Sequence, residues 1–104
     1  MKNNIFVRID RRVSEDIIEE PVFNLHLKYI EELKDNGFLI AGGFEQKDGG
    51  MVIFTAFSKA EAEKISRDDP IIKKGYYDFD LYNWDIKYIS KIKEVFSNGW
   101  YRTR

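Results

Sequence analysis

The chain has 104 residues, of which 43% are hydrophobic and 34% are charged, as in one folded domain rather than a disordered segment. With 17 Lys and Arg against 18 Asp and Glu, the formal net charge is −1, so no overall field attracts nucleic acid or an anionic membrane. The absence of cysteine excludes a disulfide scaffold, a cysteine-based zinc site and a cysteine nucleophile.

Targeting and membrane signals are missing from the sequence. The apolar run Ile5 to Val7 is followed at once by Arg8 and Asp10, whereas a secretory signal needs a core of about 7–15 apolar residues. A transmembrane helix needs about 18 apolar residues in succession, and no run approaches that length. We expect a soluble, cytoplasmic protein.

The first predicted strand covers residues 5–10. Its odd-numbered residues point to one face, and its even-numbered residues, Phe6, Arg8 and Asp10, point to the other. Residues 11–20 are polar and charged and predict a loop.

Residues 21–35 predict the first helix. Pro21 suits the first turn, where its missing N–H is not needed, and Gly37 suits the position after the helix end. Apolar residues recur at helical spacing and share one face with the single histidine of the chain. That face carries Val22, His26, Tyr29, Ile30 and Leu33.

Two strands and a second helix follow. Residues 38–41 predict a strand that ends in Gly42-Gly43, and after a turn at 47–50 the nearly all-apolar residues 51–57 predict a buried strand. Ser58 and Glu61 match a capping box in front of a helix over residues 59–67. We expect Pro70 to end this helix.

The last third of the chain is aromatic. We expect a short turn over 71–75 and a long strand over 76–89, bulged near Tyr82 or covered on both faces. Residues 88–96 predict a short helix, and residues 100–104 form a tail that mixes aromatic and basic side chains.

The element order is β-α-β-β-α-β, which predicts an α+β, ferredoxin-like fold with an antiparallel sheet and both helices on one face. We expect a single domain over 1–104, with its core at about 5–89 and a C-terminal extension at about 90–104. The other face of the sheet needs a cover, and the 15% aromatic content favours face-to-face dimerisation.

His26 and Asp69 are the first candidates for chemistry. His26 lies on the apolar face of its helix, either as a core histidine with one hydrogen bond or as a general base that titrates near neutral pH. Asp69 follows the second helix, where a carboxylate opposes the helix dipole. It therefore needs a local partner such as a backbone N–H or an imidazole, or it forms an Asx turn before Pro70.

Other site types find little support. Gly42-Gly43 allows close approach of a ligand to the backbone or forms a plain turn, and no phosphate-binding glycine motif is present. One histidine without cysteine argues against a transition-metal site. The basic C-terminal end is interrupted upstream by Asp78, Asp80 and Asp85, which argues against nucleic-acid binding.

An ordered set of landmarks resembles the YCII-related (YciI-like) family over about residues 5–86. Two differences stand out: Gly42-Gly43 replaces a frequent Gly-Pro, and the 11–20 loop and the tail after Ile86 look specific to this chain. The landmarks are His26-x-x-Tyr29-Ile30-x-x-Leu33, Gly37-Phe38-Leu39-Ile40-Ala41-Gly42, the strand Met51–Phe57, Ser58-Lys59-Ala60-Glu61-Ala62, Asp69-Pro70, Gly75 and Trp84.

The resemblance implies a dimeric α/β barrel of ferredoxin-like subunits, with His26 and Asp69 as a catalytic pair. On this basis we expect a small-molecule enzyme of isomerase or lyase type, with His26 as general acid or base and Asp69 orienting its imidazole. No cofactor or metal is expected. The expected substrate-binding residues are Tyr29 as an oxyanion donor, Gly42 and Gly43 at the strand end, and Phe44, Phe54 and Trp84 as an apolar lining.

The rival hypothesis is a non-enzymatic homodimer that binds a small ligand or another protein. In that case His26 and Asp69 are a buried structural pair. A third possibility is an interaction subunit of a larger assembly. The sequence does not name a substrate.

Overall fold

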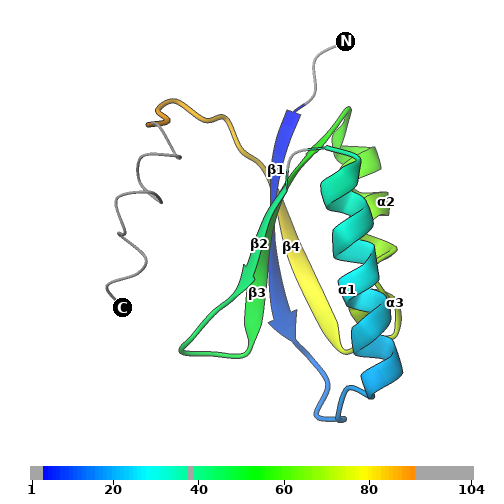
Figure 1. The fold of residues 1–104 in the computed structure, drawn as a ribbon. Coiled ribbons are helices and arrows are strands. Elements are labelled where there is room, and N and C mark those ends of the chain that lie inside the picture. The colour runs from blue at the N-terminus through cyan, green and yellow to red at the C-terminus, as the bar shows by residue number, and fades with distance from the viewer. Residues whose placement is uncertain (1–3, 38, 91–104) are drawn as a thin grey trace.

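The structure is a computed structural model that describes residues 4–37 and 39–90. Four strands form one sheet in the order β2-β3-β1-β4, and each neighbouring pair is antiparallel. Figure 1 shows the helices together on one side of this sheet, which confirms the expected α+β, ferredoxin-like fold. The elements in chain order are β1 (Asn4–Arg12), α1 (Glu20–Asp35), β2 (Leu39–Gly43), β3 (Gly49–Ala56), α2 (Lys59–Arg67), α3 (Pro70–Lys73) and β4 (Tyr77–Asn83).

The packed core occupies one end of the space between the sheet and the helices. Phe6 of β1 lies opposite Phe54 of β3, with ring centroids 6.2 Å apart, and both residues are 0% exposed. Ala62 of α2 is buried against this pair, and Ile30 and Leu33 of α1 pack on it in part. Burial of these apolar groups provides the main free energy of folding.

The first turn of α2 is capped much as the sequence predicts. The Ser58 hydroxyl accepts a hydrogen bond from the Glu61 backbone N–H at 3.1 Å. The Glu61 carboxylate accepts from the N–H of Phe57, one residue before the cap, instead of from Ser58 itself. Both contacts satisfy backbone donors that a helix start leaves free.

The region after α2 differs from the prediction. The segment expected as a turn over 71–75 contains the short helix α3, which Pro70 begins and Asp69 caps. Asp69 therefore lies at the start of a helix, where a carboxylate is favoured, and not only at the end of α2. Its side chain accepts from the Ile71 N–H at 3.2 Å, so part of the expected Asx turn is present within this cap.

The last strand is shorter than predicted and has no bulge. β4 pairs with β1 in continuous register, from Tyr77 opposite Arg12 to Asn83 opposite Phe6. The Trp84 N–H still donates to the Ile5 carbonyl at 2.8 Å, just beyond the last strand residue, Asn83. Residues 84–90 have no regular structure. The rest of the predicted helix over 88–96 and of the C-terminal extension, from residue 91, lies outside the described residues.

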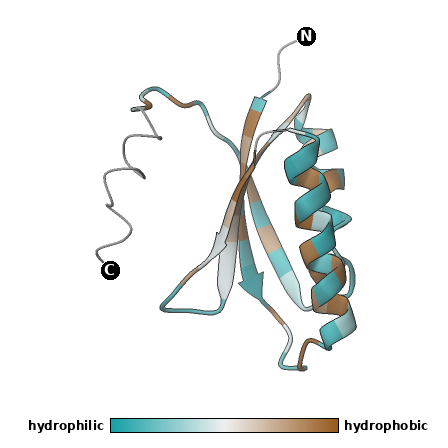
Figure 2. Cartoon of the chain, viewed as in Figure 1, coloured by the Kyte–Doolittle hydropathy of each residue, from teal (hydrophilic) through white to brown (hydrophobic). Residues whose placement is uncertain are grey.

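The second face of the sheet has an apolar part, and none of the helices among the described residues lies on it. Val7, Met51 and Ile53 share this face with Tyr82, which is 58% exposed. Together with Asn83 and Trp84 they line an open hollow of about 380 Å³. Figure 2 shows hydrophobic residues on the central strands and mostly hydrophilic ones on the outward side of α1. No helix among residues 4–37 and 39–90 is long and apolar enough to cross a membrane.

Candidate functional site

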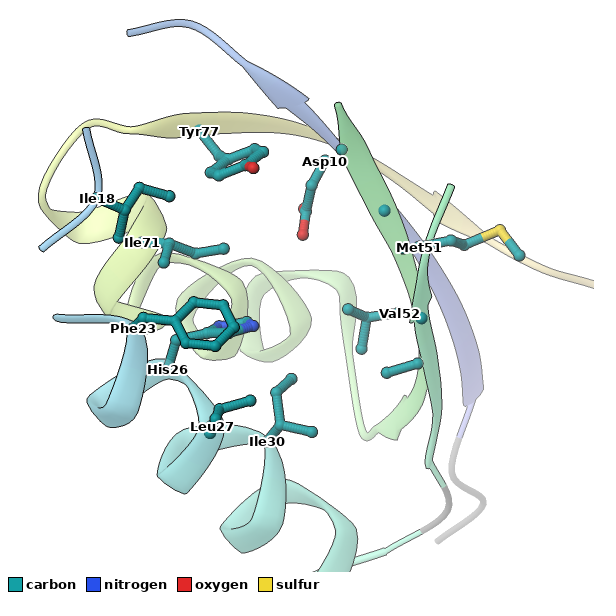
Figure 3. A pocket seen from close by; sticks show the side chains of 15 residues that line it. Asp10, Ile18, Phe23, His26, Leu27, Ile30, Met51, Val52, Ile71 and Tyr77 are labelled. Atoms are coloured by element: carbon teal, nitrogen blue, oxygen red, sulfur yellow. The ribbon is translucent and has the colours of Figure 1, made fainter. Parts of the chain in front are cut away.

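A cavity of about 370 Å³ lies between α1 and the end of the sheet away from the core. This end of the sheet carries Gly42 and Gly43 of β2 and Gly49 and Gly50 of β3, all of which line the cavity. Without side chains there, the sheet leaves space below the helix, and no residue of α1 is buried. Figure 3 shows the other side chains that surround this space. They are Asp10, Ile18, Phe23, His26, Leu27, Ile30, Ala41, Met51, Val52, Ile71 and Tyr77.

Two of these glycines are required by close backbone contacts. A Cβ atom at Gly50 would lie 2.5 Å from the Gly42 carbonyl oxygen, and one at Gly49 would lie 2.4 Å from that of Asp10. Gly49 also has a positive φ of 127°, which other residues rarely adopt. At Gly43 an added Cβ would meet nothing closer than 3.6 Å, so packing does not exclude a side chain there.

His26 and Asp69, 43 residues apart in the sequence, meet at the wall of the cavity. His26 Nδ1 lies 2.8 Å from Asp69 Oδ1. The Asp69 side chain is 0% exposed, whereas the imidazole is 17% exposed and lines the cavity. The Phe23 ring lies beside the imidazole, with centroids 6.0 Å apart. The two residues therefore have the contact that an acid–base pair needs.

A buried arginine extends this contact. Arg8 Nη2 donates to Asp69 Oδ2 at 2.8 Å. The same guanidinium binds Asp10 through two hydrogen bonds of 2.8 Å, from Nε to Oδ1 and from Nη2 to Oδ2. Arg8 is 0% exposed, and its Nη1 has no hydrogen-bond partner among the described residues. The buried cluster thus runs Asp10–Arg8–Asp69–His26.

Strand alternation places Arg8 and Asp10 on the same face of β1 as Phe6, but no role was predicted for either residue. The available signal was the alternation itself, since Phe6, Arg8 and Asp10 are the buried residues of this strand. Charged side chains at core positions are rare unless they are paired. Their partner Asp69 is 61 residues from Arg8, and no local pattern indicates it.

The protein environment raises the pKa values of two cluster members, Asp10 and Arg8, and of the nearby Tyr29. Burial raises the pKa of Asp10, while hydrogen bonding and charge from Arg8 oppose that shift. Burial disfavours the charge of Arg8, but its contacts with Asp10 and the charge of Asp69 raise its pKa overall. Burial also raises the pKa of Tyr29 to about 12. Arg8 therefore stays charged, and Tyr29 stays neutral at physiological pH.

The remaining predicted site residues divide between the cavity and other places. Gly42 and Gly43 line the cavity with His26, as the last residues of a strand and not as a plain turn. Tyr29 lies one turn from His26, but its hydroxyl donates to the Ile65 carbonyl, and it is not a lining residue.

The three aromatic residues expected in the lining all lie outside it. Phe54 is 0% exposed within the core. Phe44 lies just beyond β2, where its ring faces Lys47. Trp84 borders the hollow on the opposite face of the sheet, because β4 directs alternate side chains to opposite faces. No group of three His, Cys, Asp or Glu residues within the described part of the chain is arranged to hold a metal ion.

The topology places the chain in the ferredoxin-like class of α+β proteins. Within that class it belongs to the YCII-related domain family, which matches residues 7–85. Among solved structures it is similar to 5-chloro-2-hydroxyhydroquinone dehydrochlorinase from Burkholderia phenoliruptrix AC1100 in complex with 2,5-dihydroxybenzoquinone. The two are 25% identical with a TM-score of 0.60, over 80% of this chain and 95% of the other. No curated protein matches significantly.

Replacing Arg8 tests the buried cluster. Arg8→Met leaves two carboxylates in the core without their cation, so we expect the free energy of unfolding near neutral pH to fall by about 3–5 kcal/mol. The deficit should shrink as the pH falls and the carboxylates take up protons. Arg11→Met is the matched control, since it removes an exposed pair with Asp80 and should cost at most about 1 kcal/mol. Equal losses in urea unfolding of the two variants would contradict the assignment.

Tyr29 should make stability depend on alkaline pH. Its folded-state pKa of about 12 lies above the usual 10, so the unfolded chain loses the phenolic proton first. The contribution is complete below pH 10, and roughly 2–3 kcal/mol should be lost as the pH rises to about 12. Tyr29→Phe should lose about 1 kcal/mol at neutral pH but show a shallower alkaline decline. Urea unfolding of both proteins across this range measures the difference, and parallel curves would refute it.

Proposed function

We propose that this protein is a small-molecule enzyme that catalyses proton transfer, as an isomerase or a lyase, with His26 as the general acid–base group. One observation carries the proposal: His26 lines a largely apolar cavity while its Nδ1 contacts the buried carboxylate of Asp69. Membership of the YCII-related family and likeness to a dehydrochlorinase agree with it. The chemistry proposed requires no cofactor.

Asp69 is proposed to prepare His26 for this role. A carboxylate on Nδ1 favours the tautomer with its proton there, which leaves Nε2 free to accept a proton from the substrate. Asp69 is held in turn by Arg8 on one oxygen and by the Ile71 N–H on the other. The carboxylate therefore stays in place, and its charge stabilises the imidazolium that forms after proton transfer.

The proposed proton-transfer reactions involve no oxidation or reduction. When Nε2 removes a proton from a substrate C–H or O–H bond, the bonding pair moves into the substrate and forms a double bond. In an elimination, the leaving group departs with its own electron pair, and His26 later releases the proton to water. In an isomerisation, His26 returns the proton to another atom of the substrate. We assign no oxyanion role to Tyr29, because its hydroxyl is committed to Ile65.

We also propose that two copies of the chain pair through the face of the sheet opposite the helices. Exposed apolar surface of this kind marks an interaction site in soluble proteins. Tyr82 and Trp84 are 58% and 46% exposed there, beside the hollow lined by Val7 and Ile53. Aromatic residues of this type supply most of the energy of protein interfaces.

The catalytic assignment predicts a selective loss in His26→Gln. The measured quantity is the rate at which small enolisable and hydroxylated ring compounds exchange carbon-bound protons for deuterium, followed by NMR in deuterated water. Relative to the wild-type protein, this rate should fall by about 100- to 10,000-fold in His26→Gln. Stability should change by less than about 1 kcal/mol, because both Asp69 oxygens keep a hydrogen-bond donor. Lys28→Gln, on the exposed side of the same helix, is the control and should retain full activity.

The same two measurements, proton exchange and stability, distinguish the enzyme from the rival hypothesis of a non-enzymatic binding protein. If the wild-type protein exchanges no proton on any compound while His26→Gln loses about 1–3 kcal/mol of stability, the contact is structural. The protein would then be a binding module.

The proposed dimer has its own test. Sedimentation equilibrium should give twice the 12.4 kDa mass of the chain, and Tyr82→Glu should shift the protein towards the monomer by placing a charge in the interface. Ile17→Glu is the control, because Ile17 is 86% exposed and lies in the loop before α1. A wild-type protein that is monomeric at micromolar concentration would rule out the dimer.

A further inference from the structure

The buried cluster begins and ends at the same cavity. His26 and Asp10, its two terminal members, both line the cavity, whereas Arg8 and Asp69 between them are 0% exposed. Figure 3 shows the Asp10 carboxylate directed into the cavity, which His26 borders from α1. A ligand in this space therefore meets a titratable group on the sheet side as well as on the helix side.

The Asp10 carboxylate keeps hydrogen-bonding capacity for a ligand. Its side chain is 7% exposed, and Arg8 occupies one acceptor position on each oxygen. A carboxylate has about four acceptor positions, so about two remain open. Among the described residues, no other side chain hydrogen-bonds to this carboxylate. The two bonds from Arg8 fix its orientation and favour the ionised form.

The cavity wall also determines which charge a ligand can carry. Among the described residues, no lysine or arginine lines the cavity, and Arg8 contacts Asp10 and Asp69 from within the buried cluster. An anionic group next to Asp10 would be repelled without a counter-ion. A neutral hydroxyl group can donate to the carboxylate, and an apolar body can contact the lining side chains Phe23, Leu27 and Ile71.

From this arrangement we infer that Asp10 is a specificity-determining residue that binds a hydroxyl group of the substrate, and that the substrate class is a neutral, hydroxylated, planar ring. This inference rests on the proposed function and adds the substrate class to it. The hydroxyl donates to Asp10, which places the ring between that residue and the Nε2 atom of His26. Arg8 is a positioning residue, because it acts only through Asp10 and Asp69.

Ligand binding tests the inference without requiring turnover. NMR titrations of the wild-type chain under anaerobic conditions compare hydroquinone, which has hydroxyl donors, with 1,4-dimethoxybenzene, which has none. A hydrogen bond to a charged acceptor predicts about a ten- to hundredfold preference for hydroquinone. In Asp10→Asn the amide also offers donors, so the preference should fall to about threefold or less.

Asp80→Asn is the matched control. Asp80 also pairs with an arginine, Arg11, but it lies on the opposite face of the sheet and should leave the preference unchanged. Equal binding of both probes to the wild-type protein would overturn the inference, as would failure of both to bind at millimolar concentration. An unchanged preference in folded Asp10→Asn would do the same.

The comparison of the two probes on the wild-type chain stands even if Asp10→Asn does not fold. The outcome is also independent of catalysis. Selective hydroquinone binding that is lost in Asp10→Asn, without proton exchange by the wild-type chain, would support the role of Asp10 and refute the enzyme. Proton exchange by His26 without hydroxyl preference would support the enzyme and refute the role of Asp10.

Discussion

The arrangement of the site depends on one buried cation. Arg8 lies between Asp10 on its own strand and Asp69 at the start of α3, with hydrogen bonds of 2.8 Å to each. Asp69 connects this cation to His26 on α1. A single guanidinium therefore connects β1, α3 and α1 at the wall of the cavity. Charges in such a place persist only as a mutually compensated set, which constrains the position of every member.

The two ends of the sheet differ in role: one end contains the packed core, and the other contains the cavity. At one end, Phe6 and Phe54 fill the space beneath the helices with packed rings. At the other end, Gly43 and Gly50 leave the space open, and the polar groups Asp10 and His26 line a largely apolar cavity. The same strand, β1, contributes to both ends through the residues of one face, from Phe6 to Asp10. Stability and ligand access thus come from different segments of the same elements.

The order of the elements follows from local sequence patterns, whereas the end of β4, the helix α3 and the role of Arg8 depend on contacts between distant parts of the chain. Helical spacing, the Ser58 cap and strand alternation define the element order. The position of Asp69 after a helix pointed to a partner such as a backbone N–H or an imidazole, whereas its pairing with His26 was implied only by the resemblance to the YCII-related family. The length of β4 was overestimated because a strand extends only as far as its pairing with β1, and that pairing is not visible in a local sequence pattern. Similarly, α3 starts at a proline that also reads as a helix end, and Trp84 faces the other side of the sheet. The role of Arg8 needed a contact across 61 residues.

The exposed position of α1 has a consequence for dynamics. No residue of this helix is buried, and the cavity lies beneath much of its inner face. Segments with few buried contacts open by local unfolding more readily than the rest of a domain. A bound molecule that fills the cavity would supply the missing contacts, so occupancy and amide protection of α1 should rise together. Slower amide hydrogen exchange in α1 would therefore show that a ligand occupies the cavity, even before any reaction product is identified.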